Sequence, residues 1–252
     1  MSAPVSLRGR ILAGERVCGA LLRMPSEEIV EMLAVAGFDF IVLDCEHGPA
    51  DGLALRQHIA AAHMHGLKVL VRVGEGEEAL ILRALDSGAS GIVAPHIDSS
   101  AQAQQIVSAA HYPPLGHRGF ATYGRAGAFG TVSVAAHKHR MAEETLVIGM
   151  IESPLAVSKV DEIVAVEGLD GIMIGAADLA ASSGPGDPSI PESRDIVNAS
   201  LESARSLRLD LVGNSKEAKA AYAAGAQLVA YNLTQVMMEQ FAALLQAPPT
   251  NN

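Results

Sequence analysis

The sequence predicts an α/β protein built as a single (β/α)8 barrel, and three observations lead to this prediction. The chain has 252 residues, and one such barrel typically takes about 250. Eight short apolar runs alternate with segments of helical spacing, which is the pattern of parallel β/α units. Turn signals that contain glycine, such as AGFD, HGLK and EGLD, precede the strands, and glycine there can end the preceding helix in the left-handed region.

The expected elements follow one another without a linker or a shift in composition. We expect strands at Val17–Leu22, Phe40–Leu43, Val69–Val73, Gly91–Ala94, Leu146–Ile151, Gly171–Ile174, Leu209–Val212 and Leu228–Ala230. We expect helices at Glu27–Ala36, Leu53–His65, Glu77–Ser87, Ala101–Ala110, Ser158–Val166, Ser193–Leu207, Lys216–Ala224 and Gln235–Leu245. The long stretch between Pro95 and Leu146 holds the Gly-rich insert HYPPLGHRGFATYGRAGAFG. We therefore expect one barrel domain over residues 1–247 and a flexible tail over residues 248–252.

Composition excludes several classes of protein. A formal net charge of −10 argues against nucleic acid or an anionic membrane surface as a partner. The two cysteines, Cys18 and Cys45, have no spacing that suggests a disulfide framework or a zinc site. The chain shows no signal peptide and no apolar run of the roughly 18 residues that span a bilayer, so we expect a cytoplasmic protein. A doubly wound sheet is the competing arrangement, but no G-x-G-x-x-G follows the first strand.

Chemistry in a barrel of this kind sits at the C-terminal ends of the strands, and polar residues occupy almost all of these ends. They are Asp44, Glu46 and His47 after the second strand, Arg72 after the third, His96 and Asp98 after the fourth, Glu152 after the fifth, Asp178 after the sixth, and Asn214, Ser215, Tyr231 and Asn232 after the last two. Any one of them could simply cap a helix. Together they favour an active site.

Two of these acids, Glu152 and Asp178, are the candidate metal ligands. They follow consecutive strands, and parallel neighbours lie about 4.8 Å apart, so both carboxylates can reach one divalent ion. A set of oxygen ligands suits Mg²⁺, Mn²⁺ or Co²⁺. A 2-oxo acid could chelate such an ion, which would stabilise the enolate oxygen as a Lewis acid.

The remaining candidates would bind substrate or move protons. Arg72 can place a fixed positive charge beside the enolate oxygen, and His47 has a suitable unperturbed pKa, near 6.5, for proton transfer. Either Asp44 or Asp86 could orient the imidazole, and the sequence does not choose between them.

Two further segments could bind a carboxylate. The backbone N–H groups of Ala177 and Asp178 begin a helix, which makes them a candidate cradle for the substrate. Arg118 and Arg125 in the insert could close over the site and bind an acceptor or product. An ordinary connecting loop that packs on another subunit is the alternative reading of the insert.

Schiff-base catalysis is the main rival to a metal within aldolase chemistry. It needs a lysine buried at a C-terminal strand end. Lys68 begins the third expected strand, at the wrong end of the barrel. Lys159 and Lys216 fall in expected helices. The sequence therefore favours metal-dependent chemistry.

With these candidates in place, the chain resembles the HpcH/HpaI aldolase family over nearly its whole length. The residues that carry this resemblance are Asp44-x-Glu46-His47-Gly48-Pro49, Arg72, Leu85-Asp86-x-Gly88-Ala89-x-Gly91-Ile92, Tyr112-Pro113-Pro114-x-Gly116-x-Arg118-Gly119, Ile151-Glu152 and Gly175-x-Ala177-Asp178-Leu179. The family includes 4-hydroxy-2-oxoheptanedioate aldolase and 2-keto-3-deoxy sugar acid aldolases, enzymes of aromatic and sugar acid catabolism.

The resemblance implies a class II pyruvate-type aldolase of the phosphoenolpyruvate/pyruvate barrel superfamily, a carbon–carbon lyase. By residue, it implies that Glu152 and Asp178 hold the metal, that His47 moves protons and that Arg72 binds donor and enolate. It further implies that Asp86 pairs with the histidine, either within one subunit or between neighbouring subunits. It also implies a hexamer, a trimer of dimers, in which neighbouring subunits swap their last helix.

The chain departs from the family pattern in places. Met150 stands where glutamine is frequent, and Ala176 and Ala180 replace the proline and serine of G-P-x-D-L-S. Polar ends on the last two strands make hydroxypyruvate an expected donor beside pyruvate. We expect reversible cleavage of a 4-hydroxy-2-oxo acid into such a donor and an aldehyde. Two alternatives stay open: a citrate-lyase-like carbon–carbon lyase, and a catalytically silent barrel that binds a small acid.

Overall fold

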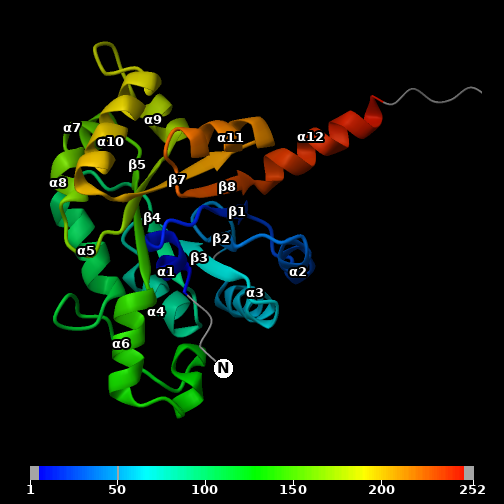
Figure 1. Ribbon diagram of the computed structural model, residues 1–252, viewed down its shortest axis with the longest axis vertical. Coiled ribbons are helices and arrows are strands. Elements are labelled where there is room, and N and C mark those ends of the chain that lie inside the picture. Colours follow the sequence, from blue (N-terminus) through cyan, green and yellow to red (C-terminus); the bar gives the residue numbers. More distant parts are fainter. Residues whose placement is uncertain (1–5, 50, 247–252) are drawn as a thin grey trace, which may run out of the picture.

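Eight parallel strands form a closed barrel in the computed structural model, which describes residues 6–49 and 51–246 (Figure 1). The strands are β1 (Val17–Leu22), β2 (Phe40–Asp44), β3 (Lys68–Arg72), β4 (Gly91–Ala94), β5 (Leu146–Ile151), β6 (Gly171–Ile174), β7 (Leu207–Val212) and β8 (Leu228–Asn232). Each strand pairs with the next along the chain, and β8 pairs with β1 to close the ring. The predicted (β/α)8 barrel is therefore confirmed.

Helices alternate with the strands, and most of them cover the outside of the barrel. They are α1 (Leu7–Leu12), α2 (Glu27–Val35), α3 (Gly52–Met64), α4 (Glu78–Asp86), α5 (Ser100–Ala110), α6 (Val134–Glu144), α7 (Pro154–Ser158), α8 (Val160–Val164), α9 (Ala176–Ser182), α10 (Ile190–Ala204), α11 (Ser215–Ala223) and α12 (Leu233–Leu245), with a short 3₁₀ segment η1 (Arg125–Gly130). The predicted tail at residues 248–252 lies outside the described residues.

Side chains alternate between the two faces of each strand. One face packs inside the barrel and the other packs against the helices, so both faces are apolar. Phe40 and Val42 of β2 point into a central core with Leu70, Ile148 and other inward residues. The residues between them on each strand pack against the helices in a separate outer core. Leu7 and Ile11 of α1 join the central core, so the first helix closes the N-terminal end of the barrel.

Two predicted helices differ from the observed ones. The helix expected at Ser158–Val166 is wrong as one element, because α7 ends and α8 begins around Lys159. The helix expected at Ser193–Leu207 is displaced: α10 starts early because Ser189 and Glu192 form a capping box. It ends at Ala204 because Arg205 adopts a left-handed conformation. The helices α1 and α6 were not predicted, and α9 was expected only as a helix that begins at Ala177 and Asp178.

Helix α12 leaves the barrel after β8 and extends away from it (Figure 1). None of its residues is buried, although Met238, Phe241, Leu244 and Leu245 are large and apolar. An apolar helix face of this kind normally packs against something. The prediction that neighbouring subunits exchange this helix stays a prediction.

Candidate active site

Asp44 and Arg72 form a buried ion pair at the C-terminal mouth of the barrel. Asp44 ends β2 and continues its inward-facing series, and Arg72 ends the neighbouring strand β3. Arg72 Nε donates to Asp44 Oδ1 at 2.9 Å, and Arg72 Nη2 donates to Oδ2 at 2.5 Å. Burial opposes ionisation of Asp44, but the hydrogen bonds and charge of Arg72 outweigh it and lower the pKa of that carboxyl. The pair therefore fixes the position of the Arg72 guanidinium at the mouth.

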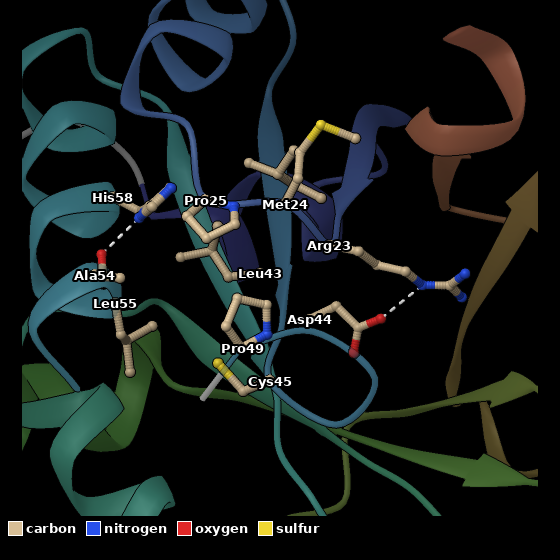
Figure 2. A pocket seen from close by; sticks show the side chains of 11 residues that line it. Arg23, Met24, Pro25, Leu43, Asp44, Cys45, Pro49, Ala54, Leu55 and His58 are labelled. Carbon is tan, nitrogen blue, oxygen red and sulfur yellow. Dashed lines mark hydrogen bonds and ion pairs between the residues drawn. The ribbon is translucent and has the colours of Figure 1, made fainter. Parts of the chain in front are cut away.

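Arg23, which follows β1, reaches the same carboxylate from the other side. Its Nε donates to Asp44 Oδ2 at 2.9 Å (Figure 2). Asp44 Oδ1 also accepts from the backbone N–H groups of Glu46 and His47, at 3.2 Å each. One aspartate thus anchors two arginines and the loop that carries His47.

A second carboxylate, Glu46, lies between three cationic or titratable side chains. Its Oε2 is 3.2 Å from Arg72 Nη1 and 4.0 Å from His47 Nε2, and its Oε1 is 3.7 Å from His96 Nε2. Within the described chain Oε2 makes no hydrogen bond, although Arg72 Nη1 approaches it. Glu46 is the carboxylate nearest to the His47 ring in these contacts.

His96 links Glu46 to Glu152. It follows β4 in a left-handed conformation, with φ of 53°, which non-glycine residues seldom adopt. In this position its backbone N–H donates to Glu152 Oε2 at 3.0 Å, and its Nδ1 lies 3.5 Å from the same oxygen. The strained backbone of His96 places its N–H against the Glu152 carboxylate, which suggests that the direction of this carboxylate matters.

Glu152 follows β5 and is buried, and it lines the same cavity as Asp178 in the first turn of α9. Burial raises the pKa of Glu152, and the charges of Glu46 and Asp178 add to this effect, while the contacts from His96 oppose it. Gly175, which precedes α9, leaves room for the carboxylate: a Cβ at this position would lie 2.1 Å from Glu152 Oε1. Two carboxylates that line one cavity, one buried and one exposed, could share a cation.

These groups surround a cavity of about 340 Å³. It is lined by Arg23, His47, Arg72, Met150, Glu152, Met173, Ile174, Gly175, Ala176, Ala177, Asp178, Arg194, Asp210 and Leu211. The predicted catalytic, metal and donor residues His47, Arg72, Glu152, Asp178 and Ala177 therefore meet in one place. His47 is half-exposed, which leaves its imidazole open to solvent and substrate.

A much smaller pocket of about 30 Å³ adjoins the mouth behind Asp44 (Figure 2). Burial raises the pKa of the Cys45 thiol in its wall to about 11, so this thiol is protonated at neutral pH. His58 is fully engaged, because it accepts from the Ser26 N–H and contacts the Ala54 carbonyl. This pocket offers packing rather than a nucleophile.

The residues of the cavity fit a divalent cation. Within residues 6–49 and 51–246 no group of three or more His, Cys, Asp and Glu side chains is arranged to hold a metal, and the cavity lining includes the carboxylates of Glu152 and Asp178. Magnesium characteristically takes one or two carboxylates and leaves its other positions to water and substrate. The space that Gly175 keeps beside Glu152 agrees with this role.

Three predicted site residues lie elsewhere in the chain. Asp86 ends α4, and therefore lies toward the N-terminal ends of the strands, where it pairs with Arg118 at 2.6 Å. Arg125 lines a cavity with Lys68, Ser90 and Thr145, which begin or precede β3, β4 and β5. In Figure 1 the insert and α6 lie at the end opposite α9. The expectation that Arg118 and Arg125 close over the site of their own chain is wrong, because the insert follows α5 rather than β4.

The sequence left the partner of His47 open between Asp44 and Asp86. Asp44 contacts the His47 backbone rather than its imidazole, and Asp86 is engaged with Arg118 at the other end. Neither aspartate orients the ring within one chain.

Several strand-end residues are helix caps. Asn214 accepts from the N–H groups of Lys216 and Glu217, and Asn232 accepts from Gln235. Lys216 lies in α11 and Lys68 begins β3, as expected.

Glu46 and His96 were predicted only as strand-end polar residues without a specific role, and Arg23 and Arg194 were not singled out. The strand-end rule would have found Arg23, because it directly follows β1. No sequence signal places Arg194 of α10 at the cavity.

No helix within the described residues is long and apolar enough to cross a membrane.

Comparison with known proteins gives a consistent result. A family model described as HpcH/HpaI aldolase/citrate lyase matches residues 21–237. A hydroxypyruvate/pyruvate aldolase of Sagittula stellata is 32% identical over 93% of this chain and 94% of its own length. A 2-keto-3-deoxy-L-rhamnonate aldolase of Escherichia coli is 34% identical over 78% of this chain and 73% of its own length. The crystal structure of an HpcH/HpaI aldolase from Desulfitobacterium hafniense superposes with a TM-score of 0.87 and 26% identity, covering 99% of this chain and 100% of that chain.

Proposed function

The chain belongs to the HpcH/HpaI aldolase/citrate lyase family, and we propose that it is a class II aldolase, a carbon–carbon lyase that reversibly cleaves 4-hydroxy-2-oxo acids. The products are pyruvate or hydroxypyruvate and an aldehyde. The observation that carries the proposal is the meeting of Arg72, His47, Glu152 and Asp178 around one cavity. The aldolase names of the similar proteins agree with it.

Glu152 and Asp178 would hold the divalent ion, which we propose to be Mg²⁺, Mn²⁺ or Co²⁺. When bound, the ion supplies a Lewis acid that polarises the 2-oxo group of the substrate. Burial, together with the charges of Glu46 and Asp178, raises the pKa of Glu152, and a bound cation would favour the ionised carboxylate.

Arg72 would bind the carboxylate and enolate oxygens of the donor. Its guanidinium is held by Asp44 through Nε and Nη2 and lies beside Glu46 at Nη1, so its orientation is fixed before substrate arrives. A preorganised charge costs no rearrangement during the reaction, which is how such a group lowers a barrier. The backbone N–H groups of Ala177 and Asp178 would take the other carboxylate oxygen.

His47 would move the protons. In the cleavage direction the C4 hydroxyl loses its proton, the C3–C4 bond breaks, and its electron pair forms the enolate of the donor as the aldehyde leaves. The enolate then takes a proton at C3 to give the 2-oxo acid. His47 is open to the cavity and can exchange protons with substrate or a nearby water.

A homo-oligomer would complete the site, and we propose a hexamer built as a trimer of dimers. The apolar residues of α12 that its own chain leaves exposed support an exchange of this helix between subunits. Asp86, Arg118 and Arg125 lie at the end opposite His47, so they could serve only the site of a neighbouring subunit.

Metal dependence provides the test. Purified protein should cleave a 4-hydroxy-2-oxo acid, lose activity in EDTA and regain it with Mn²⁺ or Mg²⁺. Glu152→Gln should stay inactive after metal addition. Aldol synthesis with pyruvate and with hydroxypyruvate establishes the donor, and no turnover of hydroxypyruvate would retire it as a substrate. Inactivity with every metal and both donors would instead support a barrel that binds small acids.

A further inference from the structure

The carboxylate of Glu152 accepts one hydrogen bond within the described part of the chain. The donor is the backbone N–H of His96, which lies 3.0 Å from Oε2. The other oxygen, Oε1, lies against Gly175, the residue that precedes α9. An ionised carboxylate has two acceptor oxygens, so a donor that holds Oε2 leaves Oε1 available on the side of α9.

The imidazole of His96 makes weaker contacts than its backbone does. Its Nδ1 is 3.5 Å from Glu152 Oε2 and its Nε2 is 3.7 Å from Glu46 Oε1, and neither contact is a hydrogen bond within the described residues. The side chain is 42% exposed, so water competes for both ring nitrogens. The contact that fixes Glu152 is therefore the one from the peptide N–H.

The turn that carries this N–H is fastened to β5 and α7 at successive residues. After His96, the N–H of Ile97 donates to the Met150 carbonyl at 3.2 Å. The hydroxyl of Ser153 then donates to Asp98 at 2.5 Å. A left-handed residue other than glycine persists only where its surroundings over-determine it, and these contacts provide that support.

Arg205 has the same backbone conformation and shows what is unusual about His96. Its φ is 55°, against 53° for His96. Arg205 ends α10, and helices commonly end in a left-handed residue. His96 instead comes two residues after the end of strand β4, so helix termination does not explain its conformation. Its N–H contact with Glu152 does.

We propose that His96 is a positioning residue for Glu152, and that it acts through its left-handed backbone rather than through its imidazole. The N–H holds Oε2, which fixes the direction in which the carboxylate meets the divalent ion. Burial raises the pKa of Glu152 and the hydrogen bond from His96 opposes this effect, so the same contact favours the ionised form that binds a cation. The inference rests on the proposed metal site, and His96 takes part in no covalent step.

Three variants that all lack the imidazole test the role of the backbone. Glycine and asparagine adopt the left-handed conformation readily, whereas a β-branched residue resists it. Calorimetric titration with Mn²⁺ should give His96→Gly and His96→Asn the affinity of the wild type. His96→Val should lose affinity by roughly tenfold or more, in the range of changes to the surroundings of metal ligands. The EPR spectrum of bound Mn²⁺ should change in His96→Val alone.

Arg205→Val is the matched control, because it strains a left-handed residue that does not line the cavity. It should lower the Tm in EDTA, as His96→Val does, and leave the affinity for Mn²⁺ and the EPR spectrum unchanged. His96→Ala is a milder probe, because alanine opposes the left-handed conformation less than valine does. It should bind Mn²⁺ with intermediate affinity, and it provides the comparison with His96→Gly if His96→Val does not fold.

Equal losses of affinity in the Gly, Asn and Val variants would assign the role to the imidazole and overturn the proposal. Wild-type affinity in His96→Val and His96→Ala would remove His96 from the site. In both cases the proposed metal site stands if Glu152→Gln abolishes Mn²⁺ binding. A wild-type protein that binds no Mn²⁺, or binds it equally well after Glu152→Gln, overturns the metal site and the positioning role together.

Discussion

The carboxylate of Asp44 and the guanidinium of Arg72 are joined by two hydrogen bonds, Nε–Oδ1 at 2.9 Å and Nη2–Oδ2 at 2.5 Å. Both side chains are almost fully buried. A buried pair of this kind stabilises little relative to an apolar pair, but removal of one partner leaves an uncompensated charge. The pair is therefore a point at which folding and the proposed chemistry depend on the same atoms.

Asp44→Asn should lower the free energy of unfolding by about 3 kcal/mol, because Arg72 loses its counter-charge. Urea denaturation at pH 7.5 measures the change, with Asp195→Asn on the exposed face of α10 as the control. In the wild type, the lowered pKa of Asp44 means that this stabilisation is complete above the unfolded value of 3.8 and is lost as the pH falls through the folded value. Equal stability of the two variants would contradict the role of the pair.

Stabilisation by metal should increase with pH. Burial raises the pKa of Glu152, so in the metal-free folded protein this carboxyl stays protonated above its ordinary pKa of 4.5. The metal-free folded state is therefore destabilised as the pH rises through the raised value. Since a metal ion competes with that proton, the increase in Tm caused by Mn²⁺ should be larger at pH 8 than at pH 5.5. Glu152→Gln should abolish the increase, and in EDTA at pH 8 it should unfold no earlier than the wild type. A metal effect that is independent of pH would argue against Glu152 as a ligand.

Gly175→Ala should weaken metal binding without unfolding the protein. The added Cβ would meet Glu152 Oε1 at 2.1 Å and force the carboxylate away, whereas φ at Gly175 is −82° and suits alanine. Calorimetric titration with Mn²⁺ should show a loss of affinity of roughly tenfold or more, in the range of changes to the surroundings of metal ligands. Gly184→Ala is the matched control, because its Cβ meets only Asp187 at 3.7 Å. Unchanged affinity in Gly175→Ala would remove this glycine from the site.

His47→Ala should slow deuterium exchange at C3 of pyruvate by roughly 100-fold or more, the usual contribution of a general acid–base group. Its affinity for Mn²⁺ should match that of the wild type, because the proposed ligands are Glu152 and Asp178. His139→Ala, in an exposed position of α6, should exchange normally. Full exchange in His47→Ala would move the proton transfer to another group, for which His96 is the nearest candidate.

The sequence predicts the barrel and most of its mouth because both depend on local patterns. Alternating apolar runs locate the strands, and the parity of β2, β3 and β5 directs Asp44, Arg72 and Glu152 toward the barrel axis. A polar residue at the C-terminal end of a strand, or directly after it, can therefore be predicted as a site candidate. The same rule also selects Asn214 and Asn232, which are helix caps, since the pattern cannot tell a cap from a ligand.

What the sequence does not predict depends on three-dimensional distance. The left-handed turn at His96 brings its backbone to Glu152 across 56 positions of the chain, and no local signal encodes that contact. Arg194 reaches the cavity from within a helix. The insert was misread although the expected helix at Ala101–Ala110 agrees with α5 and already places the insert after a helix rather than after a strand.

The opposite placement of His47 and Asp86 in one chain has a genetic consequence. If each complete centre draws His47 from one polypeptide and Asp86 from its neighbour, two individually dead mutants can complement each other. Random co-assembly of His47→Ala with Asp86→Ala chains in equal amounts would regenerate intact centres at roughly one in four positions. Self-sufficient barrels would regenerate none.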